Sequence, residues 1–232
     1  MTMTNAWRQA KDALYDGISG IARALSSGRR AEILELLAQG ERTVDEVAEE
    51  IGQSMANTSH HLRTLARAGL LSSRREGTHI HYAIASEEVL QAWWHIRALA
   101  ATSLDHIEEL AQAYLGDRDE LETLRQDELR TRLDRGDVVV IDVRPRAEYD
   151  AGHIPGAISI PPDRLDVHYD ILTPVRDVIA YCRGPYCVYA DDAVRQLRLR
   201  GRQAFRLEDG LPEWRHAGGP IELRHAHAPP HG

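Results

Sequence analysis

The sequence predicts two domains, a mainly helical one followed by an α/β one. Apolar residues recur at three- and four-residue steps through most of residues 7–68, which predicts a series of helices separated by glycines. Residues 138–143 form instead a nearly continuous β-branched run, typical of a strand buried on both faces of a parallel sheet. Charge rises and Gly116 appears after Leu115, so we expect the domains to span 1–115 and 116–232.

The bulk composition is that of a globular chain without membrane spans. Hydrophobic residues make up 43% of the 232 residues, and no apolar run approaches the roughly 18 residues that a spanning helix needs. The first residues lack a secretory apolar segment, so we expect a cytoplasmic protein. The net charge of −8 argues against indiscriminate binding of nucleic acid. Two cysteines in such a chain favour reactivity or metal binding over a structural disulfide framework.

The first domain reads as a helix-turn-helix unit. Helices are predicted over 7–25, 29–38, 43–51 and 54–68, the third opened by a capping box in which Thr43 and Glu46 cap each other. The fourth helix is expected to bury Met55, Leu62 and Leu65. Two alternating runs, 70–75 and 78–84, follow and are joined through Glu76-Gly77 as a β-hairpin with a basic tip. Together these elements predict a winged helix-turn-helix, whose second helix can enter the major groove.

The stretch from Ser59 to Leu71, with Arg75-Glu76-Gly77 and Tyr82, resembles the recognition helix and wing of ArsR-family repressors. The resemblance covers roughly residues 25–100 and implies binding to double-stranded operator DNA. Short polar groups and arginines reach phosphates or base edges. The expected DNA contacts on the exposed side of the helix are Asn57, Thr58, Ser59, His60 and Arg63, and those on the wing are Arg74, Arg75 and Thr78.

A long apolar stripe runs from Glu87 to Leu115 and predicts one helix with more apolar face than a small domain can cover. In the resembling family this helix and the N-terminal one form a homodimer interface, which suits a palindromic operator. Family members that sense metals use cysteines in a helix that here, at 44–51, contains none. Asp105 and His106 point about 100° apart on a helix and do not converge on one ion, so no metal site is predicted.

The second domain alternates helical and β-rich stretches, as in a small α/β fold. A helix is predicted over 120–135, and strands are predicted at 157–160, 178–181 and 204–207 in addition to 138–143. Both cysteines lie in the loop after the 178–181 strand, and a helix follows at once. Unpaired N–H groups and the dipole of that helix stabilise a thiolate, so Cys182 is a candidate nucleophile.

Three stretches in order resemble the rhodanese homology domain: 142–158 with Asp142-Val143-Arg144-Pro145, then Tyr181-Cys182-Arg183-Gly184, then 209–221. The family implies that Cys182 takes up sulfane sulfur as a persulfide, with the N–H groups of residues 183–188 cradling the outer sulfur. We expect Arg183 to attract an anionic donor, Asp142 and Arg144 to form an ion pair, and His153 to be structural. The predicted loop site is Cys182, Arg183, Gly184, Pro185, Tyr186, Cys187 and Val188.

Phosphatases and arsenate reductases of the same fold class carry an Arg six residues after the cysteine, where this chain has Val188. Without that Arg a phosphate dianion loses its bidentate partner, which disfavours phosphatase chemistry. Cys187 keeps several interpretations: a small apolar wall, a thiol that resolves the persulfide, or half of a two-thiolate site for arsenite. A loop that cradles sulfur is expected to hold the two Cα atoms too far apart for a direct disulfide.

The leading hypothesis is a transcriptional regulator whose rhodanese domain accepts sulfane sulfur on Cys182 and couples persulfide chemistry to operator binding. Its partners would be operator DNA, a second copy of the chain and a small sulfur donor or thiol acceptor, with no cofactor. One alternative is a rhodanese-type thiosulfate sulfurtransferase with an autoregulatory DNA-binding domain. Another is an arsenite sensor that uses both cysteines. The histidines after residue 224 are expected in a flexible tail.

Overall fold

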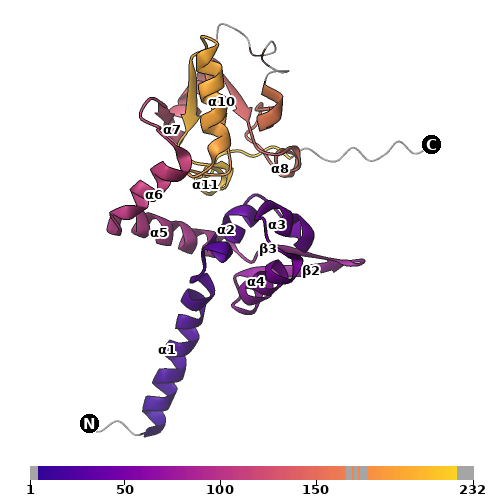
Figure 1. Ribbon diagram of the computed structural model, residues 1–232, viewed down its shortest axis with the longest axis vertical. Coiled ribbons are helices and arrows are strands. Elements are labelled where there is room, and N and C mark those ends of the chain that lie inside the picture. Colours follow the sequence, from indigo (N-terminus) through magenta and orange to yellow (C-terminus); the bar gives the residue numbers. More distant parts are fainter. Residues whose placement is uncertain (1–4, 166–168, 170–171, 173–176, 224–232) are drawn as a thin grey trace, which may run out of the picture. The chain divides into compact units, whose positions relative to one another are not determined.

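The chain forms two compact units that divide between Thr102 and Ser103 (Figure 1). The computed structural model describes residues 5–165, 169, 172 and 177–223, so the expected C-terminal tail lies outside the described residues. The predicted domain boundary after Leu115 falls at the end of helix α6 (His106–Leu115), whereas the units divide one helix earlier. The elements of the first unit are α1 (Asn5–Leu25), α2 (Gly28–Leu37), β1 (Arg42–Thr43), α3 (Val44–Glu50), α4 (Met55–Arg67), β2 (Leu71–Glu76), β3 (His79–Ile84) and α5 (Glu87–Ser103).

Side-chain caps begin α3 and α4. The Thr43 hydroxyl accepts from the Glu46 N–H at 3.4 Å, and the Glu46 carboxylate accepts from the Thr43 N–H at 2.7 Å, which confirms the predicted capping box. Ser54 accepts from the Asn57 N–H in the same way at the start of α4. Both helices pack over one core, whose fully buried members are Ile33, Leu34, Val47, Leu62 and Leu65. The helix-turn-helix therefore has the order that the sequence predicts.

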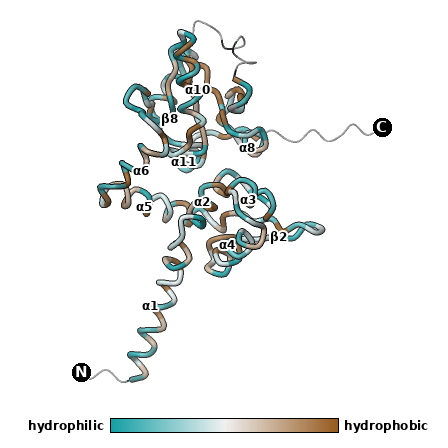
Figure 2. The backbone as a smooth tube through the Cα atoms, viewed as in Figure 1, coloured by the Kyte–Doolittle hydropathy of each residue, from teal (hydrophilic) through white to brown (hydrophobic). Residues whose placement is uncertain are grey.

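Strands β2 and β3 form the wing. They pair antiparallel from Leu71 opposite Ile84 to Glu76 opposite His79, and β1 adds to the other edge of β3. Gly77 turns the hairpin with a φ of 60°, a conformation that glycine adopts without strain. Figure 2 shows that the hairpin tip is hydrophilic, in keeping with its solvent exposure.

Two expectations for the helices of this region are wrong. Met55, expected in the core, is 51% exposed because it is the first residue of α4 and lies beyond the buried part of the helix face formed by Thr58, Leu62 and Leu65. The long helix expected from Glu87 to Leu115 is broken after Ser103, and α6 (His106–Leu115) begins anew. Thr102, Ser103 and Asp105 have side chains that compete for backbone hydrogen bonds, which weakens a helix at this point. No helix within the described residues is long and apolar enough to cross a bilayer.

The second unit is built on a parallel sheet of five strands in the order β4-β8-β7-β5-β6. The helix predicted over 120–135 begins only at Gln126, and the residues before it form an edge strand that was not predicted. After α6, the elements are β4 (Thr123–Leu124), α7 (Gln126–Arg135), β5 (Val138–Asp142), α8 (Arg146–Ala151), β6 (Ile158–Ser159), the 3-10 turn η1 (Pro162–Arg164), β7 (Asp177–Tyr181), α10 (Val188–Leu199), β8 (Ala204–Leu207) and α11 (Leu211–His216).

The central strand β7, which was predicted as a strand, is buried on both faces. Val178 and Ala180 pack in one core with Val194 and Leu197 of α10, while the alternate residues of β7 pack in the opposite core with Trp214 of α11. Because β5 and β7 are parallel neighbours, their carboxyl ends lie at one edge of the sheet. The loop that follows β7 carries the predicted catalytic residues, and the predicted ion pair of Asp142 and Arg144 lies where β5 ends.

Candidate functional site

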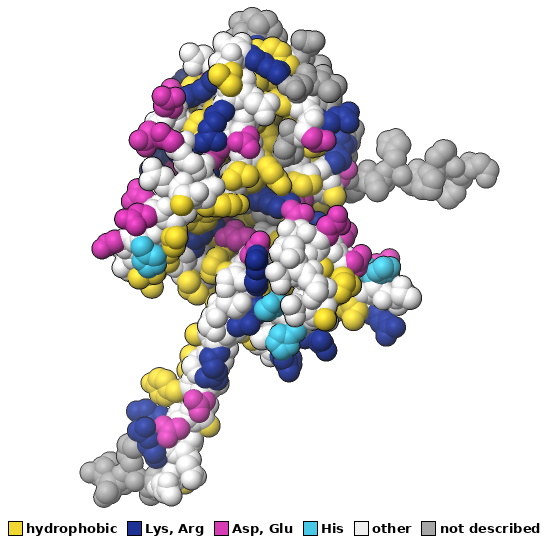
Figure 3. All heavy atoms as spheres, in the orientation of Figure 1, with side chains coloured by type: hydrophobic (Ala, Val, Ile, Leu, Met, Phe, Trp, Pro, Cys, Tyr) yellow, Lys and Arg dark blue, Asp and Glu magenta, His cyan; other side chains and the backbone are white. Residues whose placement is uncertain are grey.

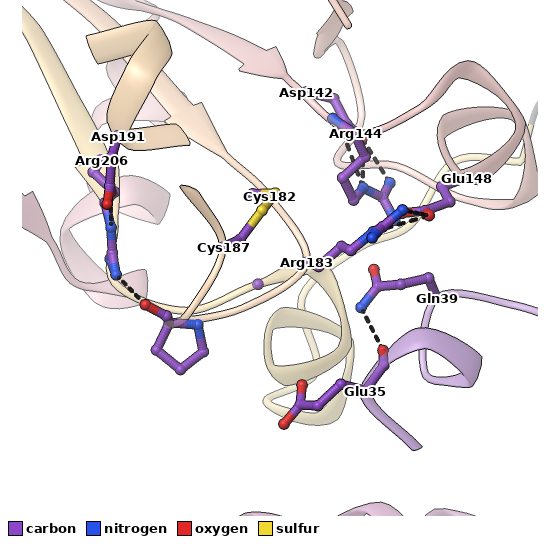
Figure 4. Close-up of a disulfide and its surroundings, with 12 residues drawn as sticks. Glu35, Gln39, Asp142, Arg144, Glu148, Cys182, Arg183, Cys187, Asp191 and Arg206 are labelled. Atoms are coloured by element: carbon purple, nitrogen blue, oxygen red, sulfur yellow. Dashed lines mark hydrogen bonds and ion pairs between the residues drawn. A yellow bond between two sulfur atoms is a disulfide. The ribbon is translucent and has the colours of Figure 1, made fainter. Parts of the chain in front are cut away.

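The two cysteines lie where β7 ends and α10 begins, and their sulfur atoms are bonded (Figure 4). Their Cα atoms are 6.2 Å apart, within the roughly 4.4–6.8 Å that a disulfide needs. The expectation that the loop would hold them too far apart is therefore wrong. The loop turns back on itself because the Cys187 N–H donates to the Gly184 carbonyl at 3.2 Å. Cys187 is thereby brought to the N-cap of α10, facing Cys182.

The N–H groups of the loop differ from the cradle that the resemblance implies. Pro185 has no N–H, and that of Cys187 is engaged by the Gly184 carbonyl, so neither is directed at a sulfur on Cys182. Cys182 itself is only 2% exposed. A side chain at Gly210 would meet the Arg183 carbonyl at 2.2 Å, so the loop needs glycine there for close backbone packing. In this bridged state the site is therefore closed to a sulfur donor.

Two arginines that are paired with one buried carboxylate hold the loop through hydrogen bonds to its backbone. Asp191, in the first turn of α10, is fully buried and accepts from Arg118 at 2.5 Å and from Arg206 at 2.9 Å. Both arginines also donate to the Pro185 carbonyl, at 2.8 and 2.9 Å. Burial and the neighbouring Arg118 lower the pKa of Arg206. We call this group of Arg118, Asp191, Arg206 and the Pro185 carbonyl the loop clamp.

No local pattern in the sequence predicts the loop clamp. Arg118 and Asp191 are 73 residues apart, and each looks like one of many exposed charges. The only available signal was Arg206, a charged residue between the apolar residues of a predicted strand. A charge at such a position needs a partner.

Arg183 does not offer its charge to the sulfur. Its guanidinium donates to the Glu148 carboxylate of α8, with the shortest contact at 2.7 Å, and Glu148 is 2% exposed (Figure 4). The expectation that Arg183 attracts an anionic donor is contradicted by this geometry. Burying a carboxylate is costly unless an opposite charge is paired with it, and Arg183 supplies that charge. Its cation is therefore neutralised by Glu148.

The predicted ion pair at the end of β5 is present and completely buried. Arg144 donates to Asp142 at 2.6 Å and to the Gly152 carbonyl at 2.7 Å. The hydroxyl of Tyr181, the residue before Cys182, donates to Asp142 at 2.5 Å and accepts from the Ile154 N–H. This network ties the carboxyl end of β7 to that of β5. It positions the backbone that carries Cys182.

His153 is buried, as its structural assignment requires. Its ring stacks on Tyr149 with centroids 3.7 Å apart, and Nδ1 lies 2.9 Å from the Tyr149 carbonyl. His95 and His106, by contrast, are exposed on α5 and α6. Within the described ranges no group of three His, Cys, Asp or Glu residues is arranged to hold a metal ion.

On the recognition helix α4 most of the predicted DNA-contacting residues face solvent. Asn57, His60 and Arg63 are exposed, and Ser59 is half-buried. Thr58, however, is fully buried, and its hydroxyl finds no hydrogen-bond partner among the described residues. Its assignment as a DNA contact is therefore wrong. Thr58 lies one helical turn before Leu62 and shares its inward face, so the adjacent polar residues misled the prediction.

The predicted DNA-contacting residues of the wing differ in whether their side chains are free to meet DNA. Arg75 and Thr78 are exposed, and Arg75 donates to the Gly77 carbonyl at 3.2 Å. Arg74 instead forms ion pairs with Glu41 and Glu76, each at 2.5 Å. Its expected phosphate contact would require these pairs to open. Arg75 is therefore the better placed cation of the two.

Comparisons with known proteins agree with both halves of this description. Residues 27–73 match the model of the arsR family of bacterial regulatory proteins, and residues 125–217 match the rhodanese-like domain. The HTH-type transcriptional regulator Rv0324 of Mycobacterium tuberculosis is 44% identical over 91% of this chain and 93% of its own length. The chain belongs to the ArsR-family helix-turn-helix transcriptional regulators that carry a C-terminal rhodanese-like domain.

Solved structures resemble each half separately. The homodimeric winged helix-turn-helix DNA-binding domain of Mb0332 from Mycobacterium bovis is 37% identical and covers 46% of this chain and 94% of its own, with a TM-score of 0.40. A rhodanese-related protein from Thermoplasma volcanium is 24% identical and covers 44% of this chain and 98% of its own, with a TM-score of 0.40.

Proposed function

We propose that this transcriptional regulator binds operator DNA as a homodimer and receives its signal as sulfane sulfur on Cys182. The observation that carries the proposal is the placement of Cys187 within bonding distance of Cys182, in a loop between β7 and α10. In a rhodanese-type nucleophile with a second thiol in reach, that thiol can displace the bound sulfur as sulfide and form a disulfide with the nucleophile. The loop is then a two-state element that a sulfur donor can switch.

The chemistry needs no further oxidant. The Cys182 thiolate attacks the outer sulfur of a donor such as thiosulfate, an S–S bond forms, and sulfite leaves with the electrons of the broken bond. The Cys187 thiolate then attacks Sγ of Cys182, the bond to the outer sulfur breaks, and that sulfur leaves with the bonding pair and takes up two protons from solvent to become hydrogen sulfide. The two thiol sulfurs lose two electrons, and the sulfane sulfur gains them.

Exposed apolar residues support the homodimer. Trp7, Leu14, Ile18 and Ile21 lie exposed on α1, where Figure 3 shows hydrophobic side chains along the helix. Others lie on α5 and α6, among them Ile96, Leu99, Leu110 and Tyr114. Helices with so much exposed apolar area are stabilised by association. Two-fold symmetry would place two copies of α4 on the half-sites of a palindrome.

Intact mass and operator affinity test the proposal together. The reduced full-length protein is treated with thiosulfate or polysulfide, beside Cys182→Ser and Cys187→Ala. We expect the bridge in the wild type, added sulfur on Cys182 in Cys187→Ala, and neither product in Cys182→Ser. Operator affinity is measured before and after treatment at one salt concentration, because salt alone changes it strongly. An affinity that treatment leaves unchanged contradicts the sensor.

The same variants decide between this function and its alternatives. Rapid, Cys182-dependent turnover of thiosulfate with cyanide or glutathione as acceptor would establish a sulfurtransferase instead. The proximity of Cys187 argues against it, since an intramolecular thiol competes with any free acceptor. A change in operator affinity on adding arsenite without polysulfide, if it is lost in Cys187→Ala, would favour the two-thiolate site.

A further inference from the structure

Arg118 contacts the sulfur loop although it lies far from it in the sequence. It follows α6 by three residues, and its guanidinium donates to the carbonyls of Pro185 at 2.8 Å and Cys187 at 3.4 Å. The same side chain donates to the buried Asp191 at 2.5 Å. We call the segment between α6 and β4, residues 116–122, the linker. One residue of the linker therefore contacts the backbone of the bridge-forming loop at two points.

The rest of this linker is held by α10, the helix that Cys187 caps. Arg195 donates to the Asp117 carbonyl at 2.8 Å, and Arg198 donates to the Glu120 carbonyl. Gly116 ends α6 with a φ of 73° and leads directly into these contacts. The segment after α6 is thus attached to the first and later turns of α10 rather than being a free tether.

The loop also has room to move on its outer side. A cavity of about 480 Å³ lies between α6 and the loop, lined by Glu108 and Gln112 on one side and by Pro185 and Tyr186 on the other. Arg118 and Arg206 belong to its lining as well. A shift of the loop into this space would not have to displace a packed core.

We propose that Arg118 is the positioning residue that couples the state of the Cys182–Cys187 bridge to α6. This inference rests on the proposed function, in which the bridge is the signal. Non-bonded sulfur atoms cannot approach as closely as bonded ones, so opening the bridge or loading a persulfide moves the Cys187 and Pro185 carbonyls. Planar guanidinium hydrogen bonds tolerate little displacement. Arg118 must then change its position to keep these hydrogen bonds, and this change displaces the end of α6.

This coupling has a direction along the chain. Helix α6 follows α5 after only Leu104 and Asp105, and α5 belongs to the DNA-binding unit. A change at the end of α6 therefore has a short covalent path to that unit. Allosteric couplings typically amount to about 5–150-fold in affinity, and we expect the bridge to change operator affinity within that range.

The test compares Arg118→Gln with Arg195→Ala in the full-length protein. Arg195 also ties the linker to α10 but does not contact the loop, so it controls for a loosened linker. The DNA is a duplex selected from a random pool by the reduced wild type. Each protein is measured reduced by dithiothreitol, and bridged by polysulfide, at one salt concentration. Intact mass counts the bridges formed.

We expect Arg118→Gln to form the bridge as the wild type does, yet to bind DNA with the same affinity in both states. Arg195→Ala should keep the wild-type ratio. Hydrogen exchange of residues 106–120 gives a second measure: it should differ between the two states in the wild type and not in Arg118→Gln. A merely structural arginine would alter exchange equally in both states.

Several results would overturn the inference. If Arg118→Gln keeps the wild-type affinity ratio, the coupling does not pass through Arg118, while the proposed function stands. If the wild type forms the bridge without any change in affinity, the proposed function and the inference both fail. If Arg118→Gln does not form the bridge, Arg118→Lys is tested. Failure of the bridge there too would assign Arg118 to the sulfur chemistry itself and not to coupling.

Discussion

The Arg183 guanidinium lies 2.7 Å from the Glu148 carboxylate and so directs its charge toward α8 rather than toward the adjacent Cys182. In a sequence, an arginine beside a nucleophile suggests an anion trap. In the structure, the carboxylate neutralises that cation, and the charge serves to attach the loop to α8.

Arg183→Ala should therefore destabilise the protein. It removes the cation that is hydrogen-bonded to the buried Glu148. Breaking a buried pair costs about 3–5 kcal/mol, and we expect less here because the Arg183 side chain is 20% exposed and Arg144 also interacts with Glu148. Arg146→Ala is the control, since its partner Asp150 is half-exposed and such pairs contribute about 0–1 kcal/mol. Urea unfolding of both variants measures the difference. Equal losses would show that Glu148 has another partner of similar strength.

Thr58→Val should stabilise the first unit by about 1 kcal/mol, because it removes a buried hydroxyl for which the described part of the chain provides no hydrogen-bond acceptor. Thr64→Val on the same helix is the matched control, as the Thr64 hydroxyl donates to the His60 carbonyl at 2.9 Å. Thermal unfolding compares the two. Operator affinity should be unaffected by Thr58→Val, and a marked loss of affinity would restore Thr58 as a DNA contact.

Tyr181 should make stability depend on pH in the alkaline range. Burial, together with the Asp142 carboxylate, raises the pKa of Tyr181 well above its ordinary 10.0. Unfolding then releases a proton above pH 10, so this contribution is complete below that pH and is lost as pH rises beyond it. Tyr181→Phe should lose about 1–3 kcal/mol at neutral pH, because Asp142 loses a donor. Its unfolding free energy should decline less steeply than that of the wild type above pH 10.

The wing offers a test of which arginine meets DNA. Arg75→Ala should weaken operator binding and lower the slope of log affinity against log salt by about one unit, as loss of one phosphate contact does. Arg74→Ala should have a smaller effect, since Arg74 is engaged by Glu41 and Glu76. Titrations at several salt concentrations separate the two. The reverse order would mean that the pairs of Arg74 open on DNA.

Local patterns predicted most of the fold. The Thr43 capping box, the hairpin at Gly77 and the strand β7 each depend on neighbouring residues, and each appears as expected. Helical spacing misled at Leu121 and Leu124, whose three-residue step suggested a helix where an edge strand pairs with β8. That pairing depends on a strand far along the chain, which no local pattern reveals.

The site was predicted in its position but not in its contacts. A strand, a short loop and a helix around Cys182 could be read from the sequence. The partner of Arg183 and the burial of Thr58 could not, because an arginine pairs across the fold and a helical threonine can face either way. The loop clamp was missed for the same reason, as it joins residues from the linker, α10 and β8.

Arg118 also bears on where this domain can be cut. The stretch that matches the rhodanese-like domain begins at residue 125, after this arginine. A fragment made to that boundary would keep both cysteines, Asp191 and Arg206 but would leave the buried carboxylate with one cation instead of two. Measurements on such a fragment would describe a loop that the intact protein does not have, and a transplanted rhodanese module would need residues from Gly116 onward to bring its own clamp.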